Sequence, residues 1–289
     1  MQPTPSSTTE PAPAPAPLLR VFVEGIGLLG PGLSDWAQGR QQLNGSLPYH
    51  RAMSVLPLPM ALPPAERRRA GKVVKVSLAA ASEAVAVSGL QASALPSVFS
   101  SSSGDGINCH EICSALASSD RLISPTRFHN SVHNASSGYW SISSGAMASS
   151  SVLCAHDGSF AAGLLEAMMQ VVVEQTAVLL VAYDTDYPEP LLGVRPLPDS
   201  FGVGLVLAPQ QSKRSLAEWT LDPTNYLSRR AADCLSHAAL EQVCKSIPAA
   251  RCLPLLSSVA AQGTGEVVLD YLPGLQLALQ VAPCPAFDA

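Results

Sequence analysis

Residues 124–168 read SPTRFHNSVHNASSGYWSISSGAMASSSVLCAHDGSFAAGLLEAM, and the rest of the chain is organised around this stretch. Its pattern predicts, in order, a loop, an amphipathic helix, a strand, a sharp polar turn and a second helix, at residues 124–130, 131–142, 149–154, 155–159 and 160–173. A turn between a strand and a helix brings side chains and free backbone N–H groups to one point. This turn, which offers His156, Asp157 and Ser159 directly after Cys154, is therefore the candidate site for chemistry.

The polar side chains of this turn do not form a recognised catalytic motif. His156 and Asp157 are adjacent, so their side chains should diverge and form no relay. Ser159 does not stand in a G-x-S-x-G elbow. Asp157 is better explained as the N-cap of the helix that follows. Cys154 falls in an apolar strand, where burial would raise the pKa of the thiol and leave it unreactive.

Metal binding is also disfavoured. His129 and His133 are four residues apart, but the residues between them do not complete an H-E-x-x-H motif. Asn130, His133 and Asn134 are better explained as residues that hydrogen-bond a loop or a partner chain. The seven cysteines are odd in number and include no C-x-x-C pair, which predicts reduced thiols in a cytoplasmic protein. We expect no metal and no cofactor.

Composition narrows the class of protein. The 289 residues are 47% hydrophobic and only 13% charged, which predicts a large core and permits a buried oligomer interface. An Ala-, Leu- and Ser-rich background accounts for the scarcity of charge equally well. The net charge of −5, with no basic run beyond Arg67–Arg69, argues against a nucleic-acid partner. We expect neither a membrane span nor a signal peptide.

The remaining segments predict an α/β fold. We expect residues 1–18 to be a disordered Pro/Ala-rich tail and residues 19–289 to form one domain. Strands are predicted at residues 20–29, 95–100, 177–183 and 201–208, alternating with helices that include one long helix at residues 65–88. This alternation predicts a mixed, largely parallel sheet covered on both faces. Later segments predict an edge strand at 215–221, helices at 225–246 and 250–261, and a hairpin of strands 267–269 and 275–281.

Two stretches resemble the β-ketoacyl synthases. RVFVEGIGLLGPG, residues 20–32, resembles their opening strand, and residues 134–138, Gly145 and residues 152–159 resemble the approach to their nucleophile. In that family the turn reads Thr-Ala-Cys-x-Ser. Counting without gaps places Asp157 at the cysteine position, and a slip of one residue would place His156 there. No histidine follows His237, so the resemblance implies that the nucleophile and both catalytic histidines are missing.

A narrower resemblance rests on SPTRFHNSVHNASSGYWSI, residues 124–142, and on LDYLPGLQL, residues 269–277. Both are similar to ketosynthase-like chain length factors found with aryl polyene and related pigment clusters. The resemblance implies a thiolase-like, layered α/β/α sandwich, truncated mainly to the amino-terminal half of a ketosynthase. It also implies a heterodimer with a complete β-ketoacyl synthase, whose cysteine would hold an acyl chain delivered by an acyl carrier protein. This subunit would then stabilise its partner and shape the tunnel for the growing chain.

The same resemblance assigns roles to residues. The strand at 149–154 would pair across the dimer, and the loop at 126–134 would reach toward the partner's site. The implied interface residues are Arg127, Phe128, His129, Asn130, His133, Asn134, Tyr139, Trp140, Ser150 and Val152, and the implied tunnel residues are Met147, Phe160 and Met168. Two alternatives remain: an acyltransferase or malonyl decarboxylase acting alone through Cys154 or Asp157, and a homodimeric scaffold. Decarboxylation needs no thiol, only oxyanion donors and a polar pocket.

Overall fold

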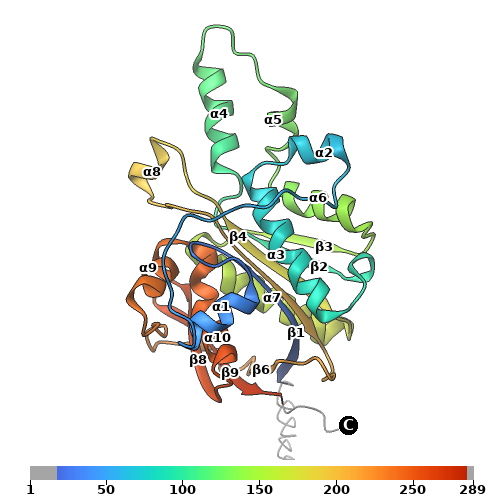
Figure 1. Ribbon diagram of the computed structural model, residues 1–289, viewed down its shortest axis with the longest axis vertical. Helices are drawn as coiled ribbons and strands as arrows, with labels where there is room; N and C mark the ends of the chain where they lie inside the picture. The colour runs from blue at the N-terminus through green and yellow to red at the C-terminus, as the bar shows by residue number, and fades with distance from the viewer. Residues whose placement is uncertain (1–17, 285–289) are drawn as a thin grey trace, which may run out of the picture.

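A single mixed sheet forms the centre of the molecule in the computed structural model, which describes residues 18–284 (Figure 1). Along the sheet the strand order is β3-β2-β4-β5-β1-β6-β9-β7, and β8 pairs with β9. The strands are β1 (Leu19–Leu29), β2 (Ser97–Ser100), β3 (Ser150–Leu153), β4 (Val178–Asp184), β5 (Phe201–Ala208), β6 (Ala217–Leu221), β7 (Leu227–Ser228), β8 (Gly265–Leu272) and β9 (Leu275–Pro283). The predicted tail lies outside the described residues, apart from Leu18.

The sheet is mixed, but the expectation that it is largely parallel is wrong. Only the pairs β2–β3 and β2–β4 are parallel, and all the other pairs in the described chain are antiparallel. The reason is the connection from β4 to β5. It contains only the four-residue helix α8 (Leu191–Val194), too little for a helical crossover, so β5 returns antiparallel beside β4. The predicted edge strand at 215–221 is also corrected, because β6 lies between β1 and β9.

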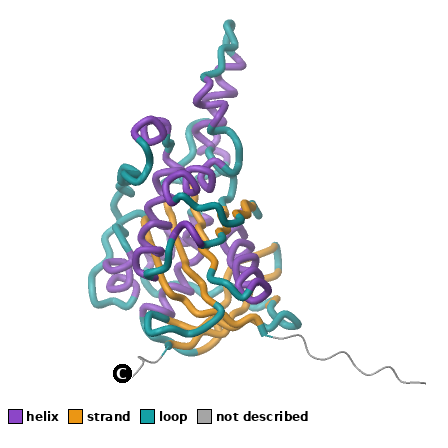
Figure 2. The backbone as a smooth tube through the Cα atoms, turned by 90° about the vertical axis from the view of Figure 1, so that its right-hand side faces the viewer, coloured by secondary structure: helices purple, strands orange, loops and turns teal. Residues whose placement is uncertain are grey.

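Helices cover both faces of the sheet, as expected (Figures 1 and 2). On one face α3 (Lys72–Ser88) and α6 (Ala135–Ser144) pack over a core that includes Phe99 and Val181. On the other face α7 (Ser159–Glu174), α9 (Ala238–Ser246) and α10 (Leu253–Ala260) enclose a second core. The remaining helices are α1 (Trp36–Leu43), α2 (Pro64–Arg69), α4 (Gly106–Ala117) and α5 (Pro125–His129), with 3-10 turns η1 (Ala92–Ala94), η2 (His156–Gly158) and η3 (Pro248–Cys252).

The contact between α3 and the sheet depends on glycine. A Cβ atom built on Gly27 of β1 would overlap the carbonyl oxygen of Ala80, and one on Gly204 of β5 would overlap the same oxygen. The helix backbone therefore lies directly on the strands, with alanines on its inner side. Glycines inside a strand often mark such a close approach of another backbone, and Gly202 and Gly204 do so here.

Three predicted helices need correction. The helix predicted at 65–88 is divided into α2 and α3, because Ala70 is extended and Gly71 takes the N-cap position of α3. The helix predicted at 131–142 begins only at Ala135, after a separate α5. The first half of the helix predicted at 225–246 is irregular and includes β7. There the backbone N–H of Asp233 donates to Val268 O (2.8 Å), which aligns this segment with β8 instead.

The segment 104–134, called the arm below, projects beyond the layers (Figures 1 and 2). It contains α4 and α5, and it leaves Leu122 and Phe128 77% and 68% exposed. Within residues 18–284, no helix is both long enough and apolar enough to cross a membrane.

Candidate functional site

The polar turn between β3 and α7 has the predicted position but an unpredicted structure. Ser159 closes it: its Oγ accepts a hydrogen bond from Ala155 N (3.0 Å) and donates to His156 O (2.6 Å). Gly158 fits beneath β8, where any side chain would overlap the carbonyl oxygen of Tyr271. The predicted N-cap role of Asp157 is wrong, since Gly158 takes the N-cap position of α7 and no side chain caps that helix. The carboxylate of Asp157 instead binds two arginine side chains.

Two arginines hold the carboxylate of Asp157. Arg195 Nη2 donates to Oδ1 at 2.7 Å, and Arg251 Nη2 donates to Oδ2 at 3.1 Å. Arg251 Nη1 also lies 3.6 Å from Asp270 Oδ2 on β8. The arginine side chains are only 24% and 18% exposed, so these ion pairs are partly shielded from water. Both carboxylate oxygens therefore accept charge-assisted hydrogen bonds from the chain itself, which occupies lone pairs that a nucleophile would need.

His156 lies closer to Asp157 than the sequence suggested. Its Nδ1 is 3.4 Å from Asp157 Oδ1, so the expectation that these side chains diverge is wrong. The cause is backbone conformation, since His156 has a positive φ of 49°, which rotates its side chain relative to an ordinary turn. The imidazole is 70% exposed.

Cys154 is exposed, which corrects the prediction of a buried thiol. The error arose because β3 is short and stands at the edge of the sheet, where Val152 and Leu153 pack against the cores but are only half-buried and Cys154 remains exposed. The thiol donates to Ser102 O at 2.9 Å. Its partner is thus a carbonyl oxygen and not an imidazole, the group that usually activates a catalytic thiol.

The buried carboxyl group of Asp184 connects the segments next to this turn. It lies at the end of β4, and its Oδ1 accepts from Ser102 N (2.9 Å) and Ser102 Oγ (2.7 Å). Its Oδ2 accepts from Ala249 N (2.8 Å), which fixes η3. Burial raises the pKa of Asp184 above its ordinary value, against these hydrogen bonds. Asp184 therefore joins β2, β4 and η3 and indirectly positions both Cys154 and Arg251.

The predicted interface strand, β3, is an edge strand. It pairs with β2 and with no other strand of the described chain. Ser149 O and Leu153 O accept from Ser97 N and Ser101 N, so alternate residues of β3 point their backbone groups toward β2. The backbone groups of the intervening residues, at positions 150 and 152, consequently face the open edge.

The predicted interface residues of the arm fall into two groups. Phe128 is exposed at its surface, and Arg127 forms a surface ion pair of 3.4 Å with Glu111. Asn130 instead binds its own chain: Nδ2 donates to Arg69 O (2.9 Å), and Oδ1 accepts from Tyr139 OH (3.1 Å). Among all the predicted interface residues, the exposed ones are Phe128, His129, His133, Asn134 and Ser150, whereas Arg127 and Val152 are half-buried and Asn130, Tyr139 and Trp140 are buried.

The three predicted tunnel residues are not brought together. Phe160 and Met168 are fully buried in the core along α7. Met147 is 95% exposed, in the loop before β3. Their assignment to a tunnel stays a prediction.

Arg195, Arg251 and Asp184 were not identified from the sequence. The two arginines lie 38 and 94 residues from Asp157, so no local spacing links them to the turn. A signal was present for Asp184 alone, as an acidic residue directly after the apolar run of β4.

Comparison with known proteins identifies the fold. The family described as β-ketoacyl synthase, N-terminal domain, matches residues 36–253. No curated protein matches the chain. Among solved structures, a ketosynthase in complex with its chain length factor from Xenorhabdus doucetiae superposes with a TM-score of 0.67 at 21% identity, covering 90% of this chain and 98% of that one.

Two further solved structures also superpose on this chain. The ishigamide ketosynthase/chain length factor superposes with a TM-score of 0.66 at 12% identity, covering 92% of this chain and 99% of that one. A β-ketoacyl synthase from Burkholderia phymatum STM815 gives 0.52 at 14% identity, covering 85% and 71%. At these identities the likeness concerns the fold, and it confirms the predicted thiolase-like, ketosynthase-type α/β architecture.

Proposed function

Since this chain belongs to the β-ketoacyl synthase family, we propose that it is a non-catalytic chain length factor that pairs with a complete β-ketoacyl synthase. In this role it stabilises the partner and shapes the acyl tunnel during polyene- or polyketide-type synthesis on an acyl carrier protein. The observation that carries the proposal is the double ion pair of Asp157 with Arg195 and Arg251. By the family resemblance a nucleophilic thiol is expected at this turn, and a carboxylate paired with two arginines stands there instead.

The open edge of β3 supports the heterodimer. An exposed strand edge is a template for pairing with another chain, and natural proteins usually cover or disrupt it. Here Ser150 and Val152 direct their backbone groups to the open edge, and the arm exposes apolar side chains that include Phe128. A partner that extends the sheet along β3 would pair with these backbone groups.

The extent of the structural match also supports the proposal. This chain covers 98–99% of the matched chains in the two structures whose names include a chain length factor, but only 71% of the matched β-ketoacyl synthase chain. Almost all of each matched chain in those two complexes therefore has a counterpart in this chain.

Co-expression tests the proposal. The full chain is produced alone and together with a complete ketosynthase from the same source, and each sample is examined by gel filtration and intact-mass analysis. We expect a 1:1 complex, a more soluble partner and no acyl adduct on this chain. A homodimer indifferent to the ketosynthase would support the scaffold alternative, and an acyl thioester on this chain would overturn the proposal.

The exposure of Cys154 favours one rival function, an acyltransferase or malonyl decarboxylase that acts alone. The isolated chain would then turn over a malonyl-loaded carrier protein. Loss of turnover in Cys154→Ala would assign an acyl transfer to the thiol, and loss in Asp157→Ala would assign decarboxylation to the turn. We expect no turnover by the wild-type chain above the rate in buffer.

A further inference from the structure

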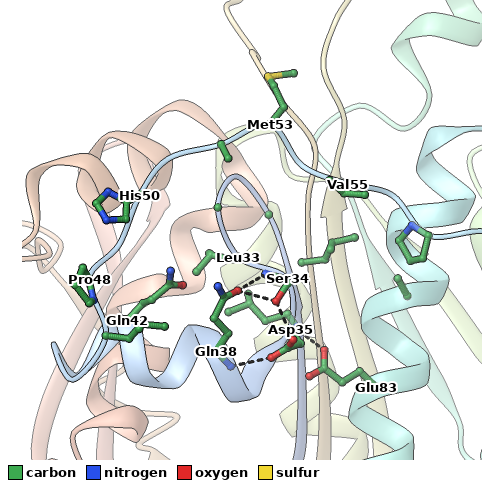
Figure 3. A pocket seen from close by; sticks show the side chains of 18 residues that line it. Leu33, Ser34, Asp35, Gln38, Gln42, Pro48, His50, Met53, Val55 and Glu83 are labelled. Carbon is green, nitrogen blue, oxygen red and sulfur yellow. Dashed lines mark hydrogen bonds between the residues drawn. The ribbon is translucent and has the colours of Figure 1, made fainter.

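We propose that a cavity between β1, α1 and the segment 47–57 binds a neutral, mainly apolar small molecule that carries a hydrogen-bond donor. Figure 3 shows side chains that line this cavity, and its volume is about 870 Å³. That volume falls in the range of small-molecule sites, about 300–1,000 Å³. It lies at the end of β1, four strands from β3 along the sheet, and is therefore separate from the turn at Asp157.

The lining of the cavity is mainly apolar. The walls come from the end of β1 and the turn after it, from α1, from the segment 47–57 and from one side of α3. Its apolar members are Leu28, Leu29, Leu33, Leu47, Pro48, Ala52, Met53, Val55, Pro57 and Ala79. Met53 and Val55 are 72% and 81% exposed at the rim. An apolar molecule entering here would also cover these two side chains, which otherwise face water.

Most polar groups of the cavity are already used by the protein. Ser34 Oγ donates to Gln38 Oε1 (2.6 Å), and Asp35 Oδ1 accepts from Gln38 N (2.7 Å) at the start of α1. Glu83 of α3 accepts two backbone N–H groups, with Oε2 from Leu28 (2.9 Å) and Oε1 from Trp36 (2.7 Å). These groups hold β1, α1 and α3 in place and contribute little free hydrogen-bonding capacity to a ligand.

Two polar side chains of the lining, those of His50 and Gln42, make no hydrogen bond within the described chain; His50 is exposed, whereas Gln42 is buried. Its side chain lines the cavity, the residue is only 6% exposed, and Oε1 is buried without a hydrogen-bond partner among the described residues. Figure 3 shows this side chain reaching from α1 toward Leu33 and Gln38. A buried acceptor without a partner is unfavourable by about 1–3 kcal/mol, so such groups usually have a partner. A hydroxyl or amide N–H on the ligand would supply one.

The charges around the cavity select against anions. Asp35 and Glu83 are the acidic residues of the lining, which also contains His50 but to which the described chain contributes no Arg or Lys side chain. A carboxylate or phosphate would be repelled. A cation would lose hydration in an apolar space whose carboxylates already accept backbone hydrogen bonds. A neutral head group with one donor suits the lining best.

Titration calorimetry of the full chain with 1-octanol, octanoate and octylammonium tests this inference. We expect 1-octanol to bind 1:1 and both ions to bind at least roughly ten-fold more weakly. Gln42→Leu should weaken 1-octanol binding roughly five-fold through the lost acceptor. It should also raise the Tm of the free protein, because an unsatisfied buried acceptor is removed.

Ala52→Trp should abolish binding by filling the mouth of the cavity, since Ala52 is exposed and lines it. Ala231→Trp, an exposed position in another segment that does not line the cavity, is the matched control and should bind like the wild type. The inference is overturned if 1-octanol does not bind the folded wild type, if Ala52→Trp binds it unchanged, or if octanoate or octylammonium binds equally well. These outcomes are independent of whether the chain pairs with a ketosynthase.

Discussion

Arg195 donates a 2.7 Å hydrogen bond from Nη2 to Oδ1 of Asp157, across 38 residues of sequence. Arg251 binds the other oxygen at 3.1 Å. The turn is therefore ion-paired both with the segment between β4 and β5, which contains Arg195, and with η3, which contains Arg251. Counted without gaps, the family resemblance would place a reactive thiol at position 157, where this chain has a carboxylate that joins three segments of the fold.

Asp157→Ala should lower the free energy of unfolding by about 1–2 kcal/mol, because it leaves two partly buried guanidinium groups without their acceptor. Urea denaturation of the isolated chain measures this change. Glu218→Ala is the control, since its partner Arg20 is 57% exposed and the pair is worth less than about 0.5 kcal/mol. Equal effects of the two variants would contradict the structural role of Asp157.

Gly27→Ala should destabilise the chain by about 3 kcal/mol or more, because the new methyl group overlaps Ala80 O and must displace α3 from β1. The comparison is Gly138→Ala on the exposed side of α6, where an added Cβ would have no atom within 4 Å. That variant should gain about 0.5–1 kcal/mol from helix propensity. Thermal unfolding of both variants measures the two effects, and a Gly27→Ala protein as stable as the wild type would contradict the close packing of α3 on β1.

Val152→Pro should weaken the complex with a ketosynthase while leaving the isolated chain folded, because the lost N–H faces the open edge of β3. Ser151→Pro removes an N–H that faces β2, so it should instead lower the Tm of the isolated chain. Gel filtration of the complex and thermal unfolding of each variant separate the two effects. If Val152→Pro assembles normally, β3 is not the pairing strand.

Asp184→Asn should destabilise the fold by about 2–3 kcal/mol at acidic pH, since an amide cannot accept from both Ser102 and Ala249. Burial raises the pKa of Asp184 in the folded state, so the folded protein holds this proton over a pH range in which the unfolded chain has lost it. The stability that Asp184 contributes is therefore full below its unfolded pKa, about 3.9, and declines as pH rises to the folded pKa.

Denaturation of wild type and Asp184→Asn across this pH range measures the difference between them, which should shrink as pH rises. A difference that grows with pH would mean that the folded protein prefers the ionised carboxylate.

Local patterns predicted much of the fold. β5 has the predicted bounds, and β1 and α7 agree with the prediction to within a residue at each end. β1 and β5 were predictable because they are buried on both sides and therefore almost continuously apolar. α7 was predictable because its apolar residues recur at the spacing of one buried helix face. The close approach of α3 to Gly204 also has a local signal, since two glycines in an apolar strand indicate that another backbone packs directly against it.

Long-range contacts account for the failures. The pattern of residues 225–246 predicted one helix, but the backbone of Asp233 binds Val268, which lies 35 residues away. The prediction for Cys154 rested on its apolar neighbours in sequence, whereas the exposure of the thiol follows from the place of β3 at the sheet edge. Neither arginine partner of Asp157 had any local signal.

The position of β1 has a consequence for how the protein is made. This first strand lies in the interior of the sheet, and both strands that flank it, β5 and β6, begin only after the 171 residues from 30 to 200 have been added. During translation the backbone N–H and C=O groups of β1 stay without their strand partners until the last third of the chain leaves the ribosome. Synthesis alongside chaperones, or next to a partner that shields the nascent sheet, would decide how much of the product survives.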